Sequence, residues 1–258
     1  MYYRATALGI AVAGSGLGGV VYPVVLQGLF SRVGFGWGVR ISGLVSGVGC
    51  VAATIMVSSL SLPKKPGPYF DIKTVADRKF LLLAAGSFFV ALVDYARSLS
   101  IPEHTSFYVL AVMNAGGVLG RLAPPYMSDT LGRFNLLVPC AFVTGLSCVV
   151  FWVFAKTVVS VMLFAATYGF FSGAFISLVN PCVAQISDIR QIGTRIGMLY
   201  TIISFPSLIG GPAAGALLAH YHGSFTAMIA FAGTTVIVGS VLLLGAKLVV
   251  DRNLLAKV

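Results

Sequence analysis

Long apolar segments alternate with short polar ones along almost the whole chain. Eight segments are long and apolar enough for membrane-spanning helices, which need about 20 mostly apolar residues. The predicted spans are residues 5–29, 39–61, 80–98, 106–127, 135–155, 159–180, 196–219 and 224–248. Asn180-Pro181 is expected to break the sixth span near its end, because proline cannot donate a helical hydrogen bond. The pattern predicts an all-α protein that crosses a membrane several times.

The composition also indicates that most of this chain lies in a lipid bilayer. Hydrophobic residues make up 58% of it and charged residues 9%, whereas soluble domains carry about 25% charged residues. The 30 glycines fall mostly within the predicted spans, where small residues let helix backbones approach each other closely. The cysteines also lie in apolar segments and have no CxxC spacing, which predicts packing residues rather than metal ligands or disulfides. These are Cys50, Cys140, Cys148 and Cys182.

The polar segment 62–79 divides the chain. Its prolines and basic residues predict a linker between residues 1–61, with two spans, and residues 80–258, a six-helix bundle. Most of the 17 Lys and Arg residues fall on the linker's side of the predicted membrane. Because basic loops stay in the cytoplasm, this bias places the linker and both termini there. The net charge of +10 therefore reports membrane orientation rather than nucleic-acid binding.

Arg121 is the candidate for chemistry. It lies inside the fourth apolar segment, with no acidic residue close by in sequence. A charge at membrane depth is costly, so such a residue is a functional-site hypothesis by default. The planar guanidinium fork suits a carboxylate. The alternative is a structural arginine bonded to backbone carbonyls near Pro124 and Pro125.

Other polar and aromatic residues on the spans have two open interpretations. Asp94 is followed by Arg97 at helical spacing, so it is either half of a structural ion pair or a proton carrier. Asn114 and Tyr168 either line a pathway or bond between helices. Phe88 either faces a cavity or is simply part of the aromatic group that flanks the third and fourth spans, whose members near the span ends belong to an interfacial aromatic belt.

Five segments together carry a family resemblance. They are Arg4 to Gly19 with Pro23, Asn114 to Arg121, Asp129-x-x-Gly132-Arg133, Tyr168 to Pro181, and Ile192 to Gly215. In this order and spacing, the chain resembles the fungal monocarboxylate-porter-like branch of the major facilitator superfamily. Family members have twelve spans in two six-helix halves. The resemblance therefore implies a partial major-facilitator fold of about eight spans, namely spans five to twelve, without the first four.

The resemblance also implies a function. It indicates secondary active transport of small organic anions, such as monocarboxylates, or related metabolites by alternating access. Protons are the candidate coupling ion for symport, and the plasma membrane is the default location. No enzymatic activity, cofactor or metal is expected. The alternative is a truncated, non-transporting membrane protein, such as a gene-model fragment or pseudogene product, or one that pairs with a full-length relative.

The resemblance also assigns a role to Arg121, which matches the family arginine that binds the substrate carboxylate. Asn114, Phe88 and Tyr168 are added as substrate-site candidates from their own positions on the spans. The family aspartate four residues before that arginine is Gly117 here. This difference leaves Asp94 as the candidate for proton coupling.

A signature loop follows Arg121 in the sequence. Asp129, Gly132 and Arg133 match the family's loop, which implies a gating role for these residues. A simple loop salt bridge is the alternative. Gly132 is expected to permit a tight turn, and the two charged residues can stabilise helix ends.

Replacing Asp94 by asparagine tests proton coupling. If Asp94 carries the proton, Asp94→Asn should flatten the pH dependence of organic-anion uptake, because an amide does not titrate. The measurement is initial uptake rate into vesicles at a series of external pH values. An unaltered pH profile would remove Asp94 from the coupling mechanism.

Overall fold

The chain folds into long helices. The computed structural model describes residues 4–56, 74, 76–96, 106–154, 157–189, 191–222 and 225–253, and the regular structure within them is entirely helical. The helices are α1 (Arg4–Met56), α3 (Arg78–Ala96), α4 (Ser106–Leu131), α5 (Arg133–Phe154), α6 (Val158–Gln185), α7 (Ile192–His220) and α8 (Phe225–Val250). The predicted all-α membrane architecture is confirmed.

Most of these helices are apolar enough to cross a membrane. Among the described residues, six segments combine the required length and composition: Ala5–Leu26, Gly28–Met56, Arg133–Val150, Val158–Gln185, Ile192–His220 and Thr226–Val250. The predicted third and fourth spans are also helical, as α3 and α4.

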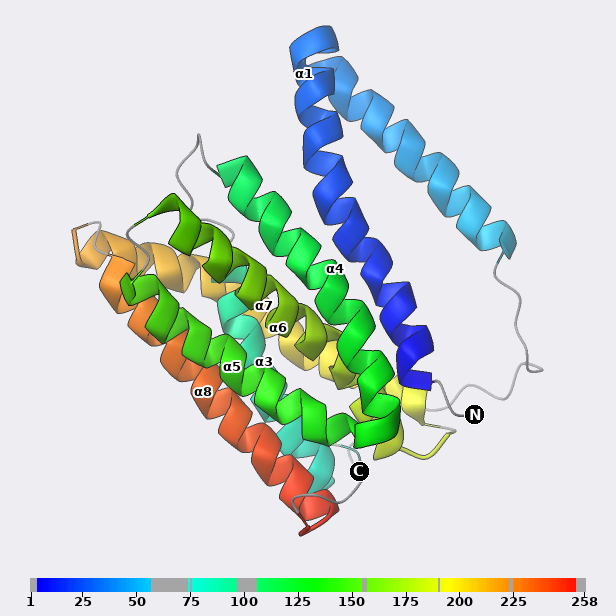
Figure 1. Cartoon of the computed structure of the whole chain (residues 1–258). Coiled ribbons are helices and arrows are strands. Elements are labelled where there is room, and N and C mark those ends of the chain that lie inside the picture. The colour runs from blue at the N-terminus through cyan, green and yellow to red at the C-terminus, as the bar shows by residue number, and fades with distance from the viewer. Residues whose placement is uncertain are drawn as a thin grey trace.

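Helix α1 contains the first two predicted spans, folded into a hairpin (Figure 1). The sequence predicted a connection over residues 30–38, but the helix is interrupted only at Gly34, where φ is 77° and ψ is 166°. Glycine adopts this backbone conformation without steric cost, so one residue suffices for the turn. The Tyr22 hydroxyl joins the two arms through Ser42 O at 2.9 Å and Ser46 Oγ at 2.6 Å.

The other six helices form an arch. Along the arch, α4 packs on α6, α6 on α5, α5 on α8, α8 on α3, and α3 on α7. Its core contains fully buried Phe80, Leu83, Phe134, Leu137 and Leu178. The first arm of α1 packs along the outer side of α4 (Figure 1). Helices α4 and α7 therefore form the two ends of the arch.

Glycines set the closest contact in the arch, between α4 and α6. A Cβ on Gly120 would overlap the carbonyl oxygen of Phe170, and one on Gly169 would overlap that of Met113. A Cβ on Gly116 would lie 2.5 Å from the Ala166 oxygen. The two backbones can touch only because these positions have no side chain, as the glycine pattern predicted.

Two helices extend beyond their predicted ends. Helix α6 continues through Asn180-Pro181 to Gln185, so the expected break at this dipeptide was wrong. Helix α4 likewise continues through Pro124 and Pro125 to Leu131. Inside a bundle, neighbouring helices and side chains can bind the carbonyls that a proline leaves without a donor. Beside this proline, Arg133 at the start of α5 donates to the Pro181 carbonyl at 3.3 Å.

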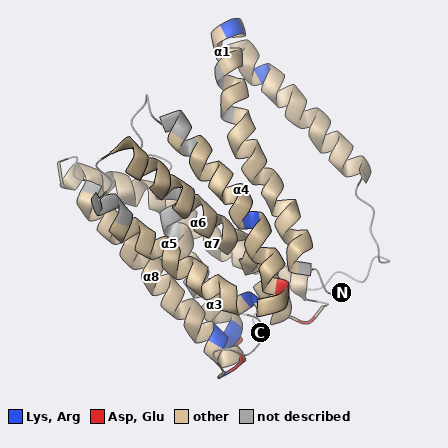
Figure 2. Cartoon of the chain, viewed as in Figure 1, with Lys and Arg blue, Asp and Glu red and all other residues tan. Residues whose placement is uncertain are grey.

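Charged residues are concentrated at one end of the molecule, where α1 begins and α8 ends (Figure 2). We call this the terminal end. A second, smaller group of basic residues, Arg32 and Arg40, flanks the α1 turn at Gly34. Residues 57–61 of the predicted second span and residues 62–73 and 75 of the predicted linker lie outside the described part of the chain, so the division into residues 1–61, 62–79 and 80–258 stays a prediction.

The glycine contacts predict a position-dependent effect of alanine. Gly120→Ala should destabilise the protein by about 1–3 kcal/mol, because the new methyl group forces α4 away from α6. Gly14→Ala is the matched control, since a Cβ at Gly14 meets nothing within 4 Å and alanine favours the helix. Thermal unfolding in detergent should give a lower Tm for Gly120→Ala only. Equal Tm values for both variants would contradict the proposed packing role.

A polar seam and a cavity around Arg121

The contact between α1 and α4 is an antiparallel seam with polar bonds along its length. At the terminal end, the Thr6 hydroxyl donates to Asp129 Oδ2 at 2.7 Å. Further along, Arg121 Nη1 donates to Ser15 Oγ at 3.0 Å. Beyond it, Asn114 Nδ2 donates to the Gly19 carbonyl at 3.2 Å. The seam therefore joins α1 to α4 from the terminal end to the middle of the bundle.

Small residues on α1 make this close approach possible. A Cβ on Gly9 would lie 2.6 Å from the Arg121 carbonyl oxygen, and one on Gly16 would lie 2.5 Å from Arg121 Nη1. A Cβ on Gly19 would lie 2.8 Å from Asn114 Oδ1. Glycine at these three positions leaves room for the polar side chains of α4 against the α1 backbone.

Asp129 binds the start of α1. Its carboxylate accepts hydrogen bonds from the backbone N–H groups of Ala5 at 3.3 Å and Thr6 at 3.1 Å, besides the Thr6 hydroxyl. The first N–H groups of a helix have no partner within the helix, and the helix dipole favours an anion there. The Asp129 side chain is only 2% exposed. It therefore serves as a buried N-terminal cap supplied by another helix.

The rest of the signature loop supports this cap. Gly132 has φ of 98°, and this conformation makes the tight turn from α4 into α5. Arg133 Nη2 lies 3.7 Å from Asp129 Oδ1, and Arg133 Nη1 donates to the Pro181 carbonyl of α6. The turn thus connects α1, α4, α5 and α6 at the terminal end. Asp129, Gly132 and Arg133 lie together as the motif predicted, although their role in gating stays a prediction.

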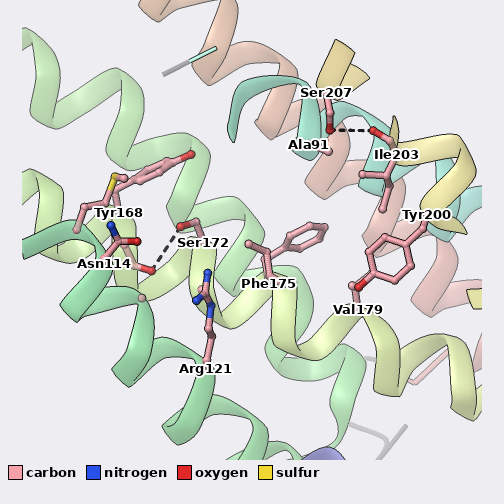
Figure 3. Close-up of a pocket in the computed structure, with 15 residues that line it drawn as sticks. Ala91, Asn114, Arg121, Tyr168, Ser172, Phe175, Val179, Tyr200, Ile203 and Ser207 are labelled. Carbon is pink, nitrogen blue, oxygen red and sulfur yellow. Dashed lines mark hydrogen bonds between the residues drawn. The ribbon is translucent and has the colours of Figure 1, made fainter. Parts of the chain in front are cut away.

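A cavity of about 530 Å³ opens between the two ends of the arch. Arg121 projects into it from α4 (Figure 3). Helix α6 supplies Tyr168, Ser172 and Phe175, and α7 supplies Tyr200, Ile203 and Ser207. Among the described residues of this lining, Arg121 is the only charged one. One guanidinium among aromatic, aliphatic and hydroxyl groups can hold an anion with an apolar body.

The structure brings together three of the four predicted substrate-site residues. Arg121, Asn114 and Tyr168 line the cavity. Asn114 also bonds α1, so it has the interhelical role that was its alternative interpretation. Tyr168 is 3% exposed and packs with Phe164, their ring centroids 5.8 Å apart. Phe88 is not part of the lining and instead contacts Phe89 edge-on on α3.

Asp94 stays a prediction for a different reason. It lies near the end of α3, but its side chain is outside the described part of the structure.

The sequence did not indicate the contribution of α7. Tyr200 lines the cavity, and its hydroxyl accepts a hydrogen bond from Asn180 Nδ2 at 2.9 Å. Ser172 and Ser207 add hydroxyl groups to the same lining. Isolated Ser and Tyr residues in apolar segments carry no local signal for a shared site, since only the packing of the helices within the arch brings them together.

A second polar cluster at the terminal end was also not predicted. Arg195 Nη1 donates to Asp77 Oδ2 at 2.8 Å and to the Ile186 carbonyl at 3.1 Å. Asp77 Oδ1 in turn accepts the backbone N–H of Lys79 and caps α3. Sequence motifs identified Arg195 only as a family position, because its partner is 118 residues away. This ion pair fixes the starts of α3 and α7 relative to each other.

Comparison with known proteins agrees with this architecture. The sequence model of the Major Facilitator Superfamily matches residues 79–255. The agnestins efflux protein of Paecilomyces divaricatus is 34% identical over 98% of the chain, and the fujikurins efflux protein of Gibberella fujikuroi is 32% identical over 98%. The aspyridones efflux protein of Emericella nidulans is 33% identical over 95%. The chain spans 60%, 57% and 52% of the lengths of these relatives, respectively.

The Asp129 cap predicts local opening of α1 when the carboxylate is lost. Asp129→Ala should cost about 1–2 kcal/mol of cap and dipole interaction. Hydrogen exchange in the first turns of α1 should then accelerate about 5- to 30-fold. Asp129→Asn keeps one acceptor oxygen and should give a smaller effect. The control is Asp251→Ala, whose carboxylate accepts only a local N–H from Asn253 after α8. Unchanged exchange in Asp129→Ala would show that the cap does not hold α1.

Proposed function

Because the chain belongs to the Major Facilitator Superfamily, we propose that it moves organic anions across a membrane by alternating access, with Arg121 as the residue that binds the anion. The observation that carries this proposal is the projection of Arg121 into the cavity between α4, α6 and α7 (Figure 3). An arginine fork binds carboxylates in a bidentate manner, and a low-dielectric cavity strengthens that attraction.

The cavity also supports a size class for the substrate. A volume of about 530 Å³ is large for a small monocarboxylate and falls in the range of pockets that hold drug-sized ligands, about 300–1,000 Å³. Relatives are named as efflux proteins for agnestins, fujikurins and aspyridones. We therefore propose outward transport of an acidic metabolite with a sizeable apolar body. Simple monocarboxylates, suggested by the branch resemblance, are the smallest members of this substrate class.

The α1–α4 seam supports a gating mechanism. In the proposed architecture, residues 1–61 and 80–258 belong to different halves, joined by the linker 62–79. The bonds from Thr6 to Asp129 and from Ser15 to Arg121 then cross between the halves. Breaking the Asp129 cap would open the terminal end of the cavity, and re-forming it would close that end. Asp129, Gly132 and Arg133 are thus proposed as the gate.

Charge distribution supports the orientation that we propose. The terminal end carries most of the Lys and Arg residues of the described chain (Figure 2). By the positive-inside rule, this end faces the cytoplasm, together with both termini. The plasma membrane is the proposed location for an exporter. Protons remain the proposed coupling ion, with Asp94 as the candidate carrier.

One observation favours a second function, that of a non-transporting membrane protein that pairs with a longer relative. In the second α1 arm, which the structure describes over Gly28–Met56, the only buried residue is Gly38. Phe35 and Trp37 are 72% and 61% exposed, and Ile55 is 80% exposed. Such a face suits either lipid or further helices. Reconstitution of the chain alone distinguishes the two functions, because only the transporter would give uptake without an added relative.

Substitution of Arg121 tests the main proposal. Arg121→Ala should reduce organic-anion transport about 10- to 100-fold in kcat/KM, the effect of losing one charged hydrogen-bonding partner. Arg121→Lys should give an intermediate value, because lysine retains the charge but loses the bidentate fork. The measurement is flux of a labelled organic acid in proteoliposomes.

The control for this test is another arginine of the same chain. Arg40 stacks over Trp37 on the second α1 arm, 5.2 Å from the ring centroid, and does not line the cavity. Arg40→Ala should therefore transport normally. Wild-type flux in Arg121→Ala, with normal membrane insertion, would reject Arg121 as the anion-binding residue.

A further inference from the structure

Ser15 occupies a specific place between the α1 backbone and Arg121. Its hydroxyl donates to the Val12 carbonyl at 2.8 Å and accepts from Arg121 Nη1 at 3.0 Å. A serine hydroxyl has a single proton and two lone pairs. Since Val12 takes the proton, the oxygen faces Arg121 as an acceptor. The local α1 backbone thereby orients this oxygen for a cation on α4.

The neighbouring residue leaves space for the guanidinium. A side chain on Gly16 would begin 2.5 Å from Arg121 Nη1, so glycine at this position keeps that space open. The bond also lies beside the cavity, because Arg121 lines it and projects into it (Figure 3). One guanidinium therefore contacts both the opposite helix of the seam and the space where an anion would bind.

From this geometry we propose that Ser15 is a surrogate ligand: it holds Arg121 in the empty protein, and the transported anion competes with it for the guanidinium. The inference rests on the proposed function, since it requires an anion at Arg121. A charge-assisted bond to a carboxylate is about twice as strong as a bond to a neutral acceptor. The exchange of Ser15 for the anion is therefore favourable, and it removes one of the bonds that join α1 to α4.

The exchange gives binding a direct effect on the seam. A ligand shifts a conformational equilibrium only through different interactions with the two states. Here the closed, empty seam contains the Ser15–Arg121 bond, and the anion-bound state does not. The Asp129 cap and the bond from Asn114 to the Gly19 carbonyl lie elsewhere along the seam and remain. Anion binding thus weakens the seam without opening it fully.

Competition and simple positioning predict opposite effects of removing the hydroxyl. If Ser15 competes with the anion, Ser15→Ala frees the guanidinium and the anion binds about 3- to 10-fold more tightly, the size of one hydrogen bond. If Ser15 only positions Arg121, the same substitution makes anion binding weaker. The direction of the change therefore separates the two roles.

The test uses the full chain in lipid nanodiscs and two readouts. The first is the affinity for benzoate, with methyl benzoate as the uncharged counterpart. The second is the distance across the seam without ligand, measured between spin labels on Ile10→Cys and Met127→Cys. Both side chains are exposed, at 60% and 46%. Cys50 is replaced by serine, because it is the exposed one of the four cysteines.

Matched variants control for the loss of a helix hydroxyl. Ser15→Thr keeps the hydroxyl and should behave as wild type. Ser31→Ala removes a hydroxyl with the same local bond, from Ser31 Oγ to the Gly28 carbonyl at 3.0 Å, at an exposed site of the same helix. It should also behave as wild type in both readouts.

Ser15→Ala should raise benzoate affinity and increase the population with a longer distance across the seam. An unchanged distance distribution without ligand overturns the proposal, even if benzoate does not bind. Weaker or unchanged benzoate binding in Ser15→Ala also overturns it. Benzoate binding that survives Arg121→Ala instead rejects the proposed function, while the distance measurement still reports on the Ser15–Arg121 bond.

Discussion

The burial of the Asp129 carboxylate against the first turn of α1 is the interaction on which the arrangement of the site depends. A carboxylate that is 2% exposed is costly unless hydrogen bonds compensate for its lost hydration, and here Ala5 and Thr6 provide them. Because the bonds come from the end of a helix, they fix the position of that helix as well as the charge. The register of α1 on α4 follows from this contact, and with it the positions of Ser15 opposite Arg121 and Gly19 opposite Asn114.

This register explains how a cation is retained in an apolar bundle. Arg121 would be unfavourable on an isolated membrane helix. In the folded chain it contacts the Ser15 hydroxyl on one side and a cavity with tyrosine and serine hydroxyls on the other. The glycine contacts between α4 and α6 place the cavity wall close to Arg121, and Arg195 with Asp77 fixes α7 at the opposite end of the arch. The close glycine contacts and the bonds of the two arginines thus hold the same helices around the cavity.

Most of the fold could be predicted from the sequence, because an apolar segment of about 20 residues is enough to identify a membrane-spanning helix. The exceptions have local causes. Gly34 turns α1 without a loop, and the surrounding bundle lets α6 continue past Pro181. Within the site, Arg121 and Asp129 were predictable, since charges in or beside apolar segments are conspicuous. Ser15, Tyr200 and the Asp77–Arg195 pair were not, because their roles arise from contacts between residues far apart in sequence.

Chemical modification of Arg121 in membranes would test most directly whether its guanidinium is an anion-binding group. Phenylglyoxal reacts with accessible guanidinium groups, and mass spectrometry can measure the extent of reaction at each arginine. Organic acids that the protein transports should slow modification of Arg121, their methyl esters should not, and the exposed Arg32 and Arg40 should react equally in every case. If a transported acid left the modification rate of Arg121 unchanged, the anion would bind elsewhere, and the central role of this arginine would be contradicted.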